Sequence, residues 1–220
     1  MTAIASQNPL LIGKGLPPFE AIKPEHIVPG MTQLLEELEQ ALTGLEANVQ
    51  PTWAGLVDPL TKIEERLRWS WSIIGHLMGV KNSPELREAY EAVQSPLVQF
   101  ANRMGQSKPI YEAYKQIREG ADWSNLDLAQ QRIVESAIRE AELSGVGLEG
   151  PAKERFNEIQ QELAELSTRF SNNVLDATKA FSLTLTTPEE VAGLPPSLLA
   201  LSAQAAREAG EANATAEAGP

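Results

Sequence analysis

The side chains that most often bind catalytic metals are scarce in this sequence, which contains two histidines and no cysteine. His26 and His76 lie about fifty residues apart, and neither belongs to a His-Glu-x-x-His or Glu-x-x-His pair, because Lys23 and Ile73 occupy the positions three residues before them. Hydrolytic zinc usually needs three protein ligands drawn from His, Asp, Glu or Cys. We therefore predict no metal-ligating residue. His76 is expected to be partly buried and hydrogen-bonded, and His26 to lie at the surface or to cap a helix.

Neighbouring carboxylates and serines are the other candidates for chemistry. Residues i and i+1 of a helix do not face each other, so adjacent glutamates do not form an acid–base pair and are expected on solvated faces. A nucleophilic serine needs a nearby base and an orienting acid, and the sequence has no Gly-x-Ser-x-Gly. Gly13-Lys14-Gly15 lacks the spacing of a phosphate-binding loop. We therefore predict no catalytic and no cofactor-binding residue. The adjacent glutamates expected on solvated faces are Glu36–Glu37, Glu64–Glu65 and Glu189–Glu190.

Four tryptophans offer flat surfaces on which a ligand could stack. Trp53 and Trp71 fall on one helical stripe of apolar residues, so packing in a core is favoured for both. Trp69 points elsewhere on the same helix, and it is expected to line a groove or to pack against a neighbouring lobe.

Composition limits the partners and the compartment. The formal net charge is −12 over 220 residues, which disfavours nucleic acid as a partner but also agrees with a purely solubilising surface. No apolar run reaches the roughly 20 residues of a membrane span, and the first residues lack a secretory signal. Because cysteine is absent, a reducing cytoplasm is the expected location.

The elements that would position any site are mainly helices. Apolar residues recur at steps of three or four, and proline or serine stands where helices are expected to begin. We predict an extended arm over 1–23 and an antiparallel helical lobe over 24–180, with Pro59 marking a helix start or a kink and a helix beginning near Ser124. The longest stripe follows Pro151 and comprises Phe156, Ile159, Leu163, Leu166, Phe170 and Val174.

The pattern changes after the helical lobe. Residues 181–186 alternate apolar and polar, which predicts one short β-strand, and Thr187-Pro188-Glu189-Glu190 predicts a capped helix start. A last helix is expected from Pro196 to about Ala209, so 181–210 forms a strand plus a helix, and 211–220 is a flexible tail without large apolar residues. A single strand needs a partner for its backbone groups, so the fold is expected to be unfinished at this point.

Several stretches, taken in order, resemble the N-terminal region of the thimet oligopeptidase and oligopeptidase A family of zinc metallopeptidases. Their order and spacing agree over most of the chain, from about residue 8 to 200. The stretches are Asn8–Leu11, Leu16–Phe19, Ile22–Pro29, Val80–Tyr90, Glu142–Leu148, Phe170–Thr178 and Thr187–Pro195. Each stretch alone is weak evidence of the resemblance, whereas the ordered set is specific to this family.

The resemblance implies that a predominantly all-α chain forms the incomplete N-terminal part of a two-lobed, channel-forming peptidase that hydrolyses short peptides. It also implies that the zinc-binding His-Glu-x-x-His lies in a C-terminal catalytic lobe, on the same or a separate chain, so that this chain alone is inactive. No position here corresponds to the zinc ligands. The alternative is a free-standing, non-enzymatic helical module that binds peptides or a partner protein.

Overall fold

The computed structural model of the chain describes residues 8–216, and over this range the chain is predominantly helical. The predicted all-α class is therefore confirmed. The chain divides into two compact units, the first ending at Ser167 and the second beginning at Thr168. The first seven residues of the predicted arm and the last four of the predicted tail lie outside the described residues, and the domain limits given above stay predictions.

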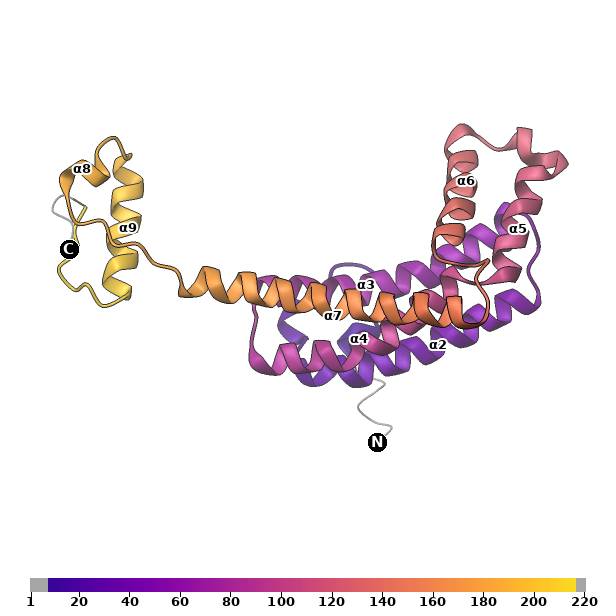
Figure 1. Cartoon of the computed structure of the whole chain (residues 1–220), viewed down its shortest axis with the longest axis horizontal. Helices are drawn as coiled ribbons and strands as arrows, with labels where there is room; N and C mark the ends of the chain where they lie inside the picture. The colour runs from indigo at the N-terminus through magenta and orange to yellow at the C-terminus, as the bar shows by residue number, and fades with distance from the viewer. Residues whose placement is uncertain (1–7, 217–220) are drawn as a thin grey trace. The chain divides into compact units, whose positions relative to one another are not determined.

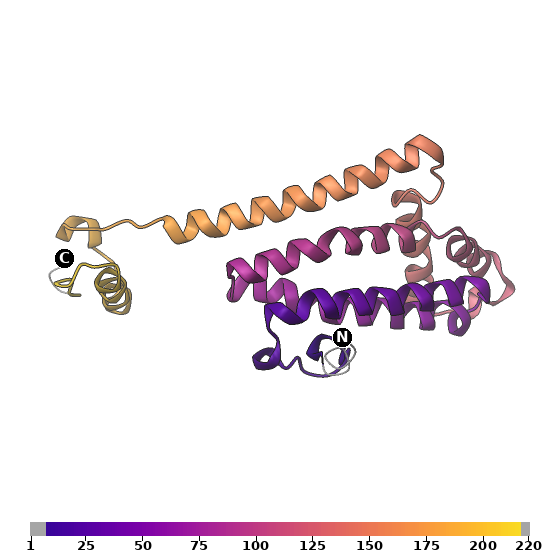
Figure 2. The same ribbon diagram turned by 90° about the horizontal axis from the view of Figure 1, so that it is seen from below.

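The first unit is a bundle built around three long helices that lie side by side, α2, α3 and α4 (Figures 1 and 2). Helices α5 and α6 pair with each other at one end of this bundle (Figure 1). The elements are η1 (Pro9–Leu11), η2 (Phe19–Ala21), η3 (Pro24–His26), α2 (Ile27–Ala47), η4 (Trp53–Val57), α3 (Asp58–Val80), α4 (Pro84–Gly105), α5 (Lys108–Glu119), η5 (Ala121–Asn125), α6 (Leu128–Leu143) and the start of α7 (Gly150–Ala180).

Helix starts follow the capping chemistry of the sequence. The Ser83 hydroxyl accepts a hydrogen bond from the Leu86 backbone N–H at 3.2 Å, immediately before Pro84 opens α4. Pro59 stands in the first turn of α3, so it marks a helix start. The start predicted near Ser124 is wrong: η5 occupies that stretch, and α6 begins only after Asp127, whose carboxylate accepts from the Gln130 N–H at 2.8 Å.

The core of the first unit lies along one face of α2. Met31, Leu34, Leu38 and Leu42, spaced three or four residues apart, are at most 2% exposed. Helices α3 and α4 both pack against α2. Burying one such side chain contributes about 1.5–3 kcal/mol to the stability of the fold. The face that the sequence periodicity predicts is therefore the face that packing buries.

A buried polar clamp holds the N-terminal stretch against the bundle. The Asn8 side chain donates to the His26 carbonyl at 2.7 Å and accepts from the Leu10 N–H at 3.0 Å. The Ser70 hydroxyl of α3 donates to the Leu10 carbonyl at 2.7 Å, and the Leu10 side chain is fully buried. Gly30 of α2 lies directly beneath Asn8, and a Cβ placed there would lie 2.6 Å from Asn8 Nδ2.

The second unit contains the rest of α7, then α8 (Pro188–Val191) and α9 (Pro196–Glu208). The predicted β-strand at 181–186 is wrong, because residues 181–186 form no regular secondary structure. A strand requires a neighbour that satisfies its backbone groups, and the described part of the chain contains no β-strand to serve as one. Near the end, Arg207 donates to the Ala214 carbonyl at 2.6 Å, and Ala214 is buried.

The clamp predicts opposite effects for two glycine substitutions in α2. Gly44→Ala meets no atom within 4 Å, so its better helix propensity should raise the free energy of unfolding by up to about 1 kcal/mol. Gly30→Ala gains the same propensity but displaces Asn8, and the loss of buried hydrogen bonds should lower that free energy by about 1–2 kcal/mol. Urea unfolding measures both variants, and equal stabilisation by the two would contradict the close approach.

Candidate functional site

The two histidines lie in different settings and do not form a metal site. His26 accepts a hydrogen bond at Nδ1 from the Lys23 backbone N–H at 3.1 Å, which agrees with the predicted capping role. His76 is exposed, and its ring centroid lies 5.4 Å from that of Phe19. The prediction of a partly buried, hydrogen-bonded His76 is wrong, because the neighbouring Leu77, not His76, occupies the buried face of α3.

The neighbouring glutamates Glu36 and Glu37 lie in different settings, as their helical spacing requires. Glu37 pairs with Arg66 at 2.6 Å, whereas Glu36 is exposed. Glu190 accepts hydrogen bonds from the Thr186 and Thr187 backbone N–H groups, each at 3.0 Å, and so holds the start of α8. Within residues 8–216 no group of three or more His, Asp or Glu side chains is placed to hold a metal ion. The histidines and carboxylates that the structure describes therefore do not fit a zinc centre.

The tryptophans contribute to the first unit's packing. Trp53 and Trp71 pack against the core, as predicted, and the Trp71 ring stacks on Tyr90 with centroids 4.6 Å apart. Trp69 also packs against the core, and its indole N–H donates to the Gly15 carbonyl at 3.1 Å. Trp69 thus helps to fasten the N-terminal stretch.

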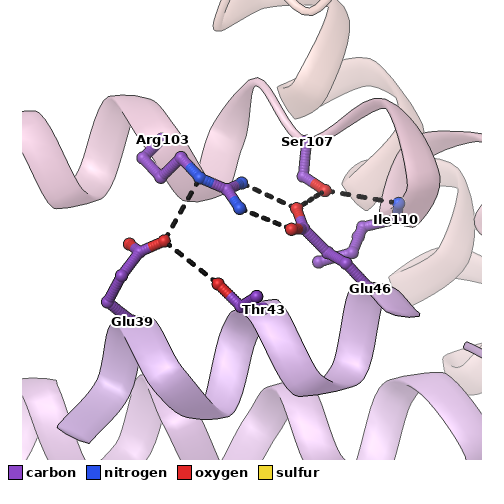
Figure 3. A network of polar contacts seen from close by, with 6 residues as sticks. All are labelled: Glu39, Thr43, Glu46, Arg103, Ser107 and Ile110. Carbon is purple, nitrogen blue, oxygen red and sulfur yellow. Dashed lines mark hydrogen bonds and ion pairs between the residues drawn. The ribbon is translucent and has the colours of Figure 1, made fainter. Parts of the chain in front are cut away.

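A polar network joins the end of α2 to the turn between α4 and α5 (Figure 3). The Arg103 guanidinium donates to both Glu46 carboxylate oxygens, with Nη1 2.6 Å from Oε1, and the Ser107 hydroxyl donates to the same carboxylate. Arg103 Nε lies 3.4 Å from Glu39, which also accepts from the Thr43 hydroxyl. One carboxylate therefore binds two other helices at once.

The electrostatics of this network favour the charged form of Glu46. Hydrogen bonding from Arg103 holds the pKa of the Glu46 carboxyl below its ordinary value; burial opposes this effect and the Ser107 hydroxyl adds to it. The Glu46 side chain is only 13% exposed, against 39% for Arg103. The pair is thus half-buried, which makes it stronger than a solvated surface ion pair.

A cavity of about 480 Å³ opens beside this network. It is lined almost entirely by polar side chains from the ends of α2 and α4 and the starts of α5 and α7. The sequence contains only one signal of this cavity, the i, i+4 spacing of Lys153 and Asn157 on α7. The lining residues are Glu46, Gln99, Asn102, Arg103, Gln106, Ser107, Lys108, Pro109, Lys153 and Asn157.

Helix α7 presents a row of apolar side chains that the described residues leave partly exposed. The predicted stripe is helical, but none of the residues of α7 is buried. In the first unit Ile159, Leu163 and Leu166 are 38%, 51% and 47% exposed. A polar contact joins this part of α7 to the bundle, since Gln94 of α4 donates to the Ala164 carbonyl at 2.9 Å.

The second unit also exposes large apolar side chains. Phe170 and Phe181 are 71% and 75% exposed, and Leu183 is 71% exposed. Further exposed members in this unit are Val174, Leu198 and Leu201. Over residues 8–216, none of the helices combines the length and apolar character that a membrane span requires.

Comparison with known proteins places this helical domain among peptidase domains. Residues 31–153 match the model of the neurolysin/thimet oligopeptidase N-terminal domain. The chain is 53% identical over 215 residues to the organellar oligopeptidase A, chloroplastic/mitochondrial, of Arabidopsis thaliana, covering 98% of this chain and 27% of that protein. It is 52% identical over 215 residues to the probable cytosolic oligopeptidase A of the same plant, with 98% and 31% coverage.

A bacterial relative gives the same result. Oligopeptidase A of Salmonella typhimurium is 44% identical over 205 residues, with 93% of this chain and 30% of that protein covered. The helical fold and these matches together define the class of this chain, an N-terminal domain of the oligopeptidase type. The chain belongs to the neurolysin/thimet oligopeptidase family, and it spans about 30% of the length of the relatives it matches.

The half-buried position of Glu46 yields a prediction about pH. Because the pKa of Glu46 is lowered on folding, its stabilisation is present above the unfolded pKa of about 4.5 and is lost as pH falls through the folded value. At pH 7, Glu46→Gln should lower the free energy of unfolding by about 1–2 kcal/mol. This is less than a fully buried charged hydrogen bond contributes, because solvent screens the partly exposed Arg103. Below pH 4 the difference in the free energy of unfolding between the variant and the parent should shrink, because Glu46 becomes protonated in the parent.

Two glutamates of α2 supply controls for this measurement. Glu37→Gln removes an ion pair whose two side chains are about 40% exposed, and it should change stability by at most about 0.5 kcal/mol. Glu36→Gln alters an exposed carboxylate with no hydrogen bond to any described residue and should change less. Urea unfolding at several pH values compares the three, and an equal loss for all of them would refute the special role of Glu46.

Proposed function

We propose that this chain is the N-terminal, channel-forming lobe of an oligopeptidase that hydrolyses short peptides. On this proposal the peptide-cleaving centre and its zinc lie in a C-terminal lobe, on the same or a separate chain, and the present chain contributes no catalytic, metal or cofactor ligand. The match to the N-terminal domain of the family and the coverage of about 30% of its relatives support this assignment.

The exposed apolar face of α7 is the observation that carries the proposal. Ile159, Leu163 and Leu166 recur at the spacing of a helix face that packs against another element. Contiguous apolar surface is rarely left in water on a soluble domain and commonly marks an interaction site. The C-terminal lobe is the occupant that the partial coverage of the relatives suggests.

The irregular segment at 181–186 gives a second argument. Its apolar–polar alternation is that of a strand, yet the backbone N–H groups of residues 182–185 donate no hydrogen bond to any residue that the structure describes. A segment with such unpaired backbone groups can pair with a strand of another domain, as the open edge of a sheet does. We propose that the C-terminal lobe supplies that strand.

We also propose the cytoplasm as the compartment. The absence of cysteine from the sequence supports it, as does the name of one relative, a probable cytosolic oligopeptidase A. The chloroplastic/mitochondrial relative agrees with this less well.

Peptidase activity tests the division of labour. The purified 220-residue chain, assayed with a quenched fluorescent oligopeptide and added zinc, should release fluorescence no faster than buffer, because its two histidines do not form a zinc centre. Intact oligopeptidase A serves as the positive control. Zinc-dependent cleavage that copurifies with the chain through several columns would show that the catalytic centre lies here.

Hydrogen exchange tests the proposed strand. In the chain alone, the amides of residues 182–185 should exchange at nearly the rate of an unstructured peptide, since no described group protects them. In a chimera that continues the chain with the C-terminal part of a related oligopeptidase A, the same amides should slow by at least about a hundredfold. The amides at the centre of α2, protected in both proteins, are the internal control, and unchanged exchange at 182–185 would exclude the pairing.

The alternative of a free-standing helical module predicts a different solution behaviour. An autonomous module should be a clean, stable monomer by light scattering, whereas a lobe with uncovered apolar faces should self-associate. Substitution of Leu163 and Leu166 by glutamate should restore the monomer if those faces cause the association. A monomeric parent chain would favour the module.

A further inference from the structure

The polar cavity between α2, α4, α5 and α7 has the donors of a binding site. Two of its residues, Lys153 and Asn157, stand four residues apart on α7 and therefore project from the same side of that helix. Lys108 lies across from them at the start of α5, and Asn102 contributes from α4. The cavity thus collects ammonium and carboxamide groups from three helices.

The buried Gln106 determines which atom of Asn157 is available. Gln106 Nε2 donates to the Ser144 backbone carbonyl at 3.0 Å, and because that carbonyl can only accept, the orientation of the Gln106 amide is determined. The same Nε2 lies 2.8 Å from Asn157, so the facing atom must be the acceptor Oδ1. The two hydrogens on Asn157 Nδ2 then have no partner among the described residues.

Among the residues that the structure describes, one cation at the cavity has no hydrogen-bonded partner. Arg103 is satisfied by Glu46 and Glu39. Lys108 Nζ pairs with Glu149 at 2.5 Å. Lys153, which is half-buried, makes no hydrogen bond or ion pair with any residue that the structure describes, and its charge helps to lower the pKa of the exposed Glu149.

Donors without acceptors select the chemistry of the ligand. An ammonium offers three N–H donors and a carboxamide nitrogen two, and neither accepts a hydrogen bond at these atoms. Charge-assisted hydrogen bonds from such groups are strongest to carboxylate or phosphate oxygens. At about 480 Å³ the cavity also has the size of a small-molecule site rather than of a single ion.

We propose that this cavity binds a small molecule through an oxyanion, a carboxylate or a phosphate, held by Lys153 Nζ and Asn157 Nδ2. Gln106 is a positioning residue, because it holds the Asn157 amide with its nitrogen free. The Asn102 amide and the Gln99 amide oxygen are available for the remainder of the ligand, because Gln99 Nε2 already donates to the Ser95 hydroxyl at 3.3 Å. The site belongs to the first unit alone and does not depend on the proposed peptidase function.

The experiment is a titration of the full chain, followed by the NMR signals of the asparagine side-chain amides. The probes are trialanine, trialanine amide and inorganic phosphate. Saturable shifts at Asn157 with trialanine but not with its amide identify a carboxylate ligand, and shifts with phosphate alone identify a phosphate ligand. Absence of saturable shifts with all three probes, or saturable binding of trialanine and its amide with the same affinity, would overturn the proposal.

Two variants test the donors. Lys153→Ala removes the ammonium, and Asn157→Asp replaces the donor nitrogen with an acceptor while leaving an oxygen for Gln106; each should weaken binding at least about tenfold. Lys62→Ala, an exposed lysine on α3 outside the cavity, should leave the affinity within about twofold. Unfolding curves verify that the variants are folded, and an affinity unchanged in both cavity variants would exclude this site.

Discussion

The burial of one face of α2 is the constraint on which the first unit depends. Leu38 and Leu42 are completely buried, and both α3 and α4 pack against the helix that carries them. Because α2 contacts both helices, its position determines where the following elements can lie. The clamp at Asn8 uses the same helix, since Gly30 gives the asparagine room to approach α2. Packing of α2 therefore orders both the bundle and the stretch before it.

Polar contacts then complete what apolar packing leaves undetermined. The Glu46 carboxylate lies at the end of α2, where the apolar stripe stops, and it receives hydrogen bonds from Arg103 and Ser107 (Figure 3). This contact fixes the turn from α4 to α5. Gln106, within that turn, donates to both Ser144 and Asn157 and so ties the start of α7 to the same place. The cavity exists because polar groups, not leucines, join these four helix ends.

Sequence periodicity predicted the helices well because it reports which residues share a face. The α2 stripe, the start of α4 at Pro84 and the helix after Pro151 all follow from local rules of spacing and capping. The start of α6 was misplaced because a 3-10 helix also places residues in a helix-like pattern. The cavity could not be predicted, since Glu46 and Lys153 line it together only because of tertiary packing and neither has an unusual sequence neighbourhood.

The same periodicity could not distinguish a face that is buried in the chain's own core from one that stays exposed. His76 and Leu77 are adjacent, yet only the leucine is buried. A shift of one position along a helix is therefore enough to turn a buried side chain into an exposed one. The stripe of α7 has the spacing of a core face, but its Leu163 and Leu166 remain about half exposed. Residues 181–186 alternate like a strand and lack a described partner. An apolar pattern with the spacing of a buried face, found on surfaces that stay exposed, supports the proposed interface, and it occurs both in α7 and in the segment that follows it.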